Sequence, residues 1–187
     1  MNNKVSDFIG VLIVSISLLL TSCIRTVVLR NGITKVPINE KNYRNRVYCD
    51  SLLKKEIEST VFYEKVNLRY QKLYRIDDHV ESTFYGMFKF YSNGNVNYFL
   101  INKSLEFSPQ SVDPSFCGYR GVYYRKNDNI KVDLFSITSE LGSIGKKNKV
   151  ISFGGDTLYV TDERSMITEI YIKRELPLEY FQYIAEW

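Results

Sequence analysis

The stretch Gly-Tyr-Arg-Gly-Val-Tyr-Tyr-Arg-Lys-Asn-Asp-Asn-Ile-Lys-Val-Asp-Leu, residues 118–134, determines the fold class. Residues alternate in polarity on both sides of Asn127-Asp128, a dipeptide typical of the tight turn in a β-hairpin. Pairing outward from that turn divides the side chains between two faces. The apolar face consists of Tyr119, Gly121, Tyr123, Ile130, Val132 and Leu134. The opposite face carries charged residues such as Lys131 and Asp133, so we expect it to contact water.

A second hairpin is expected over residues 84–101. Asn93-Gly94 can adopt the positive φ angles that a type I′ turn requires. A two-residue loop at this dipeptide pairs Phe88 with Phe99. Because side chains alternate between faces along a strand, a slip of one residue would exchange the two faces.

Further strands are expected on both sides of these hairpins. Residues 149–160 can fold about Gly154-Gly155, residues 166–173 alternate once more, and an alternating pattern begins near Val61. Several strands with short turns and no helices between them predict an all-β fold, an antiparallel meander that forms a barrel or half-barrel. Its expected interior consists of Phe88, Phe99, Ile101, Tyr119, Tyr123, Ile130, Val132, Leu134, Ile151, Phe153 and Leu158.

The N-terminal region has a different pattern. Residues 8–20 are mostly apolar, but thirteen helical residues extend only about 20 Å, against a hydrocarbon core of about 30 Å. A lysine precedes this run, and small residues follow it in Leu20-Thr21-Ser22-Cys23. We therefore interpret residues 1–22 as a secretory signal peptide.

The sequence Leu-Thr-Ser-Cys at positions 20–23 resembles the lipobox of bacterial lipoproteins. This resemblance implies that Cys23 is diacylated on its thiol and becomes the first residue of the mature chain. Ile24 stands where an aspartate would favour the inner membrane, and no acidic cluster follows. The resemblance thus implies an outer-membrane anchor that faces the periplasm. An ordinary signal peptide with an incidental cysteine is the alternative.

The mature chain divides into two parts. Residues 23–48 mix charges with Asn and Pro and predict a tether, whereas residues 49–187 predict one β domain with a short helix near residues 50–59, capped by Asp50. The formal charge of +4 suits an anionic envelope surface and is too small to indicate nucleic-acid binding.

Two cysteines remain once Cys23 is acylated. An exported compartment permits a disulfide between Cys49 and Cys117, although buried free thiols are equally compatible with the sequence. We expect no catalytic role for either residue.

Motifs for catalysis or cofactor binding are weak. The single histidine lies in Asp77-Asp78-His79, which we interpret as a turn, because a metal site normally needs three or four converging ligands. Residues 142–147 lack the spacing of a phosphate-binding loop. The acidic residues fall mostly in expected turns, where solvation explains them. We therefore predict no catalytic residue, no metal and no cofactor.

The runs at residues 118–123 and 151–158 resemble small Bacteroidetes lipoproteins with lipocalin-like, partly open β-barrels. This resemblance implies a fold but no activity. The 15 Tyr and 11 Phe residues favour core packing over an aromatic-lined cavity. Any ligand would then contact the rim, where Tyr85, Tyr124 and residues 145–147 are the candidates.

Taken together, these features favour a lipid-anchored envelope protein that acts as a non-catalytic binding or interaction module. The expected partners are the membrane, through lipidated Cys23, and either an unknown protein or a small apolar ligand. Two alternatives stay open, a small envelope hydrolase and an immunity or inhibitor lipoprotein that caps a toxin or enzyme.

Overall fold

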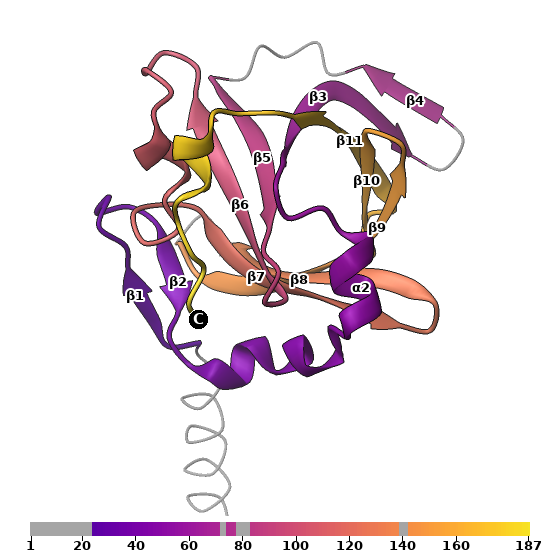
Figure 1. Ribbon diagram of the computed structural model, residues 1–187, viewed down its shortest axis with the longest axis horizontal. Coiled ribbons are helices and arrows are strands. Elements are labelled where there is room, and N and C mark those ends of the chain that lie inside the picture. The colour runs from indigo at the N-terminus through magenta and orange to yellow at the C-terminus, as the bar shows by residue number, and fades with distance from the viewer. Residues whose placement is uncertain (1–23, 72–73, 78–82, 139–141) are drawn as a thin grey trace, which may run out of the picture.

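Eight antiparallel strands close into a β-barrel in the computed structural model, which describes residues 24–71, 74–77, 83–138 and 142–187 (Figure 1). Strands that follow each other in the chain pair with each other, and the last barrel strand returns to the first. The barrel strands are β3 (Phe62–Gln71), β5 (Phe84–Phe90), β6 (Asn95–Asn102), β7 (Tyr119–Lys126), β8 (Asn129–Ile137), β9 (Ile144–Gly154), β10 (Thr157–Asp162) and β11 (Ile167–Arg174). The predicted all-β class is confirmed, and β4 (Tyr74–Asp77) pairs with the end of β3.

The β7–β8 hairpin has the predicted register. Asn127 and Asp128 have φ angles of 49° and 60°, as a type I′ turn requires. Tyr123 pairs with Val132, and both side chains are fully buried inside the barrel.

The β5–β6 hairpin differs from the prediction by one residue. Only Gly94 has a positive φ, of 89°, and the Tyr91 N–H donates to the Asn95 carbonyl over 2.9 Å. The loop therefore has three residues and ends in a glycine bulge. Phe88 consequently pairs with Tyr98, and Phe99 points outward.

The interior near this turn is filled with aromatic rings, which confirms most of the expected core. Phe90 packs edge-on against Tyr63 and Tyr123, with ring centroids 6.0 and 5.5 Å apart. Of the expected interior residues, the buried ones in this cluster are Phe88, Tyr123, Val132, Leu134, Ile151 and Leu158. The partly buried ones are Tyr119, Ile130 and Phe153. The corrections are Phe99 and Ile101, which pack outside the barrel because of the register shift.

Helix α2 (Ser51–Glu56) closes this end of the barrel. The Asp50 carboxylate caps the helix by accepting the Leu53 N–H over 2.7 Å, as predicted. Leu53 and Ile57 are buried in the same cluster as the aromatic rings. The helix therefore acts as an apolar plug.

The region predicted as a tether, residues 23–48, is instead folded against the barrel from Thr26 onward. It contains β1 (Thr26–Val28), β2 (Lys35–Pro37) and the 3-10 helix η1 (Glu40–Tyr48). Tyr43 packs on the outer face of β7 and β8, with its ring 5.3 Å from that of Phe135. The outer face is thus covered, and Asp133, which we expected in water, is only 1% exposed.

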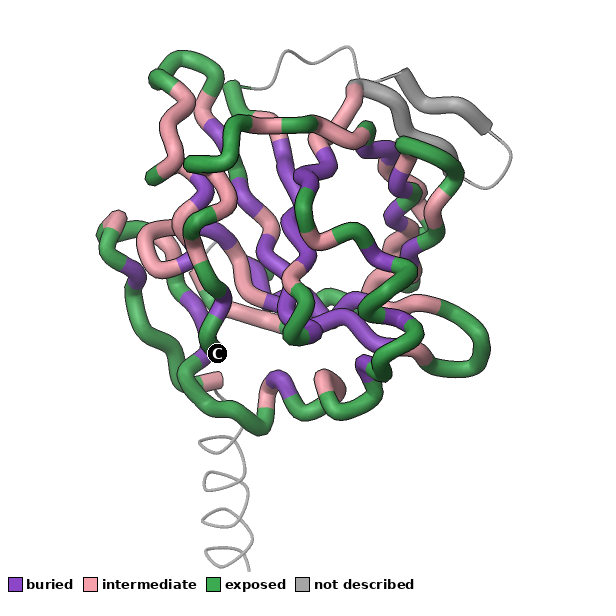
Figure 2. The backbone as a smooth tube through the Cα atoms, in the orientation of Figure 1, coloured by how far each residue is buried: buried purple, intermediate pink, exposed green. Residues whose placement is uncertain are grey.

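The C-terminal residues 175–187 cover another outer face. This segment includes η3 (Leu178–Phe181), which lies near η2 (Pro109–Val112). Met87 and Phe99 are buried beneath it, and Trp187 donates its indole N–H to the Gly121 carbonyl over 3.1 Å. Figure 2 shows buried residues concentrated on the barrel strands, and exposed ones on the connecting segments. Among the residues described, no helix is long and apolar enough to cross a membrane.

Candidate functional site

The two ends of the barrel differ in how they are filled. Strand β3 starts beside α2 and ends at Gln71, which pairs with Ile167 and so marks the end opposite the plug. Towards that end the described residues enclose a cavity of about 320 Å³. Its walls come from β5, β6, β7, β8, β9 and β11. We call this cavity the mouth cavity.

One wall of the mouth cavity holds a charged network. The Tyr171 hydroxyl donates to the Glu169 carboxylate over 3.0 Å, and the Lys65 ammonium lies 2.7 Å from the same group. Burial opposes ionisation of Glu169, but the Lys65 charge and hydrogen bond outweigh it and lower the Glu169 pKa. Burial raises the pKa of Tyr98 to about 12. The pKa of Tyr171 is also raised by burial, so the hydroxyls of Tyr98 and Tyr171 stay protonated near neutral pH and can donate hydrogen bonds.

Two other polar groups line the mouth cavity without a strong partner. The Ser136 hydroxyl belongs to a residue that is 6% exposed, and it has no hydrogen-bond partner among the described residues. Lys147 is exposed and forms no ion pair with a described carboxylate, whereas its neighbour Lys149 pairs with Asp162 at 2.9 Å. A buried hydroxyl without a partner is unfavourable unless water or a ligand satisfies it.

An apolar groove of about 460 Å³ adjoins the mouth cavity. The two share Leu100 and Tyr119. The exposed apolar side chains in the groove are those of Ile33, Phe84, Leu100 and Leu105. A polar hollow therefore borders an apolar surface.

The predicted rim residues are only partly at this end. Tyr124 is buried on the outer face and donates to Asp133 over 3.1 Å, so it is not a rim residue. Tyr85 packs with the outer cluster and accepts a long hydrogen bond from Arg174. In the predicted loop 145–147, which is part of β9, Lys147 alone lines the mouth cavity.

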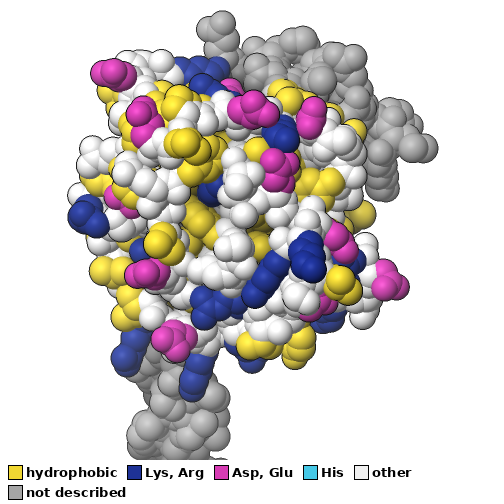
Figure 3. Space-filling view, in the orientation of Figure 1, with side chains coloured by type: hydrophobic (Ala, Val, Ile, Leu, Met, Phe, Trp, Pro, Cys, Tyr) yellow, Lys and Arg dark blue, Asp and Glu magenta, His cyan; other side chains and the backbone are white. Residues whose placement is uncertain are grey.

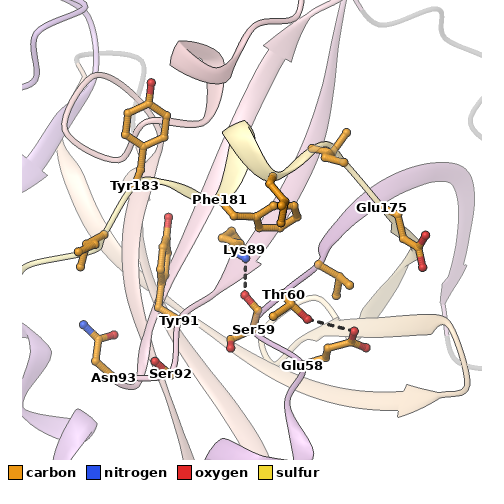
Figure 4. Close-up of a pocket in the computed structure, with 14 residues that line it drawn as sticks. Glu58, Ser59, Thr60, Lys89, Tyr91, Ser92, Asn93, Glu175, Phe181 and Tyr183 are labelled. Carbon is orange, nitrogen blue, oxygen red and sulfur yellow. Dashed lines mark hydrogen bonds between the residues drawn. The ribbon is translucent and has the colours of Figure 1, made fainter.

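A larger pocket, of about 600 Å³, lies between the C-terminal segment and the β5–β6 turn. Its notable residue is Lys89, which is 4% exposed and donates to the Ser59 carbonyl (Figure 4). The ammonium lies 4.3 Å from the ring centre of Phe181 and 5.0 Å from that of Phe62. Burial lowers the pKa of Lys89 to about 8. Lys89 lies on the outer face of β5, where the C-terminal segment covers it.

Cys49 and Cys117, the two remaining predicted site residues that the structure describes, lie in different parts of the fold. Both are free thiols, in different clusters, and no disulfide joins them in the structure. Burial raises the pKa of Cys117 to about 12, and its thiol donates to the Ser111 carbonyl over 3.2 Å. Cys23 and His79 lie outside the described residues. Within the described part of the chain, no group of three metal-ligating side chains occurs.

The fold defines a class, the closed eight-stranded antiparallel β-barrel, and it is consistent with the lipocalin-like form expected from the sequence. Comparison with protein-family models, curated proteins and solved structures gave no match.

Proposed function

We propose that the chain is a lipid-anchored envelope protein and a non-catalytic binding module. The mouth cavity carries this proposal, because a hollow of this size with an unpartnered hydroxyl and several donors suits a small-molecule site. The adjoining apolar groove favours an amphiphilic molecule whose polar end enters the cavity. The proposed ligand is therefore amphiphilic, whereas the sequence led us to expect an apolar one.

The anchor in this proposal is an acylated Cys23, in the outer membrane and facing the periplasm. The lipobox resemblance supports it. Changing Cys23 to Ala should leave an unacylated chain that no longer fractionates with membranes as a lipoprotein. A Cys23→Ala variant that still fractionates with membranes as a lipoprotein would contradict this location.

A protein partner is the second candidate, because the apolar groove exposes several large side chains at the barrel rim. An immunity or inhibitor lipoprotein would belong to this class.

The test is capture of the full chain from solubilised envelope, with mass spectrometry of bound lipids, small molecules and proteins. Lys147→Glu changes an exposed charge at the mouth cavity, and Lys126→Glu is a matched exposed control on the β7–β8 turn. We expect a small molecule that the Lys147 variant loses and the Lys126 variant retains. Equal recovery of the small molecule with the wild type and both variants would contradict the proposed site.

A further inference from the structure

The small net charge of the chain conceals an uneven distribution. Residues 24–55 contain eight Lys or Arg and two Asp or Glu, a net charge of +6, whereas residues 56–187 have a net charge of −2. The basic part is the N-terminal segment that covers the barrel. Five of its eight basic residues are exposed near η1 and α2.

This surface, which we call the basal face, lies over η1 and α2. In a 3-10 helix, residues three apart share a side, so Lys41, Arg44 and Val47 are aligned while Tyr43 faces the barrel. The exposed basic residues of the basal face are Arg25, Lys41, Arg44, Lys54 and Lys55, and the exposed apolar ones are Ile38, Val47, Tyr48 and Leu52. Figure 3 shows Lys and Arg side chains gathered over this lower part of the molecule.

The exposed acids Glu40 and Asp50 lie in the same segment, but the exposed basic side chains outnumber them, and the apolar side chains of the basal face are uncovered. Among the described residues, none of the five basic side chains forms an ion pair with a carboxylate within 4.0 Å. Val47 is 79% exposed and Leu52 is 67% exposed. Exposed bulky apolar groups among unpaired cations are typical of a surface that lies on an anionic bilayer.

The basal face also lies next to the proposed anchor. Ile24 follows Cys23 directly and packs against the cluster that contains Tyr43. The Ile38 N–H donates to the Arg25 carbonyl over 3.1 Å, which fixes the first described residues beside η1. One residue extends at most about 3.6 Å, so a diacylated Cys23 cannot lift the domain off the membrane.

We propose that the basal face docks on the anionic bilayer that holds the acyl chains, so that the domain lies flat on the membrane without a tether. This inference rests on the proposed lipid anchor. Because α2 closes the barrel end beside this face, docking directs the mouth cavity away from the membrane. A ligand can then reach the cavity from the aqueous side.

The test uses the full chain, processed in cells and purified in detergent, with mass spectrometry of the N-terminal peptide to establish acylation of Cys23. The protein is inserted into vesicles of phosphatidylcholine, alone or mixed equally with phosphatidylglycerol. Acetylation rates of lysines are then compared between vesicles and detergent. Lys41, Lys54 and Lys55 report on the basal face, and the exposed Lys103 and Lys147, at the opposite end of the barrel, are the controls.

We expect labelling of the three basal lysines to slow several-fold in the anionic vesicles only, with the controls unchanged and the protection lost at high salt. The double variant Lys41→Gln/Arg44→Gln should reduce protection at Lys54 and Lys55, whereas Lys103→Gln/Lys147→Gln should not. Acylated protein with equal labelling in vesicles and detergent would overturn docking and leave the anchor intact. A chain without acyl groups on Cys23 would overturn both.

Discussion

Replacing Lys89 with methionine removes a buried charge and keeps an unbranched side chain of similar length. The pKa of Lys89 falls from 10.5 to about 8 on burial, and each unit corresponds to about 1.4 kcal/mol. Burial of the ammonium therefore costs at most about 3 kcal/mol near neutral pH. The neighbouring aromatic rings and the Ser59 carbonyl favour the charged form and reduce this cost. We expect Lys89→Met to be more stable than the wild type by about 1–3 kcal/mol near neutral pH.

The pH dependence gives a sharper test. Because folding lowers the pKa of Lys89, the unfolded chain binds this proton more tightly, and the destabilisation is relieved as the pH rises from about 8 towards 10.5. Folding raises the pKa of Cys49 and Cys117, so these thiols lower stability over the same range in both proteins. The informative quantity is thus the difference between variant and wild type. Its upper value should fall from about 3 kcal/mol near pH 7 to about 2 kcal/mol near pH 9.

Urea unfolding at these two pH values measures that difference, provided that the dependence on urea is the same for both proteins. Lys126→Met, at an exposed position, is the control and should change stability little. The reasoning would be refuted by a Lys89→Met protein that is less stable than the wild type near neutral pH. A difference that does not change with pH would refute it equally.

Three further predictions concern the core, the covered outer face and the thiols. Tyr123→Ala should lower the free energy of unfolding by about 3–5 kcal/mol, and Tyr123→Phe, which keeps the ring but loses the hydroxyl that donates to the Tyr91 carbonyl, by about 1 kcal/mol. A Tyr123→Ala chain with an unchanged melting temperature would contradict the packed interior. Asp133→Ala should lower the free energy of unfolding by about 3 kcal/mol, because the donors Asn45 of η1 and Tyr124 of β7 lose their acceptor. Thermal unfolding measures this loss, and a change near zero would contradict the burial of Asp133. Thiol labelling of the denatured, unreduced protein should find both Cys49 and Cys117 reactive, and protection of both thiols would show that a disulfide joins them.

Local pattern predicted most of the barrel strands and the start of α2. Alternation around Asn127-Asp128 gave the correct register, because the type I′ turn needs positive φ at both of its residues and this dipeptide tolerates it. Asp50 marked the start of α2 for a similarly local reason, since its carboxylate accepts an N–H three residues along the chain.

The register at Asn93-Gly94 was less determined, because this dipeptide suits both a two-residue and a three-residue loop. The structure has the longer loop, so the inward face of β6 changes from Phe99 to its neighbours. The polar mouth cavity was likewise missed. Ser136 and Lys147 follow the alternation, but their meeting at one end depends on how the strands are staggered around the barrel.

The sequence by itself determined which residues form most of the barrel strands, where most turns lie and which side chains share a face, because these depend on neighbours in the chain. Only the tertiary structure decided which faces are buried. Asp133 lies on a strand face that alternation assigns to water, and Lys89 lies on the outer face of β5, yet segments from the two ends of the described chain cover them. Alternation reports the direction of a side chain relative to its own strand, and burial depends on contacts with residues far away in the sequence.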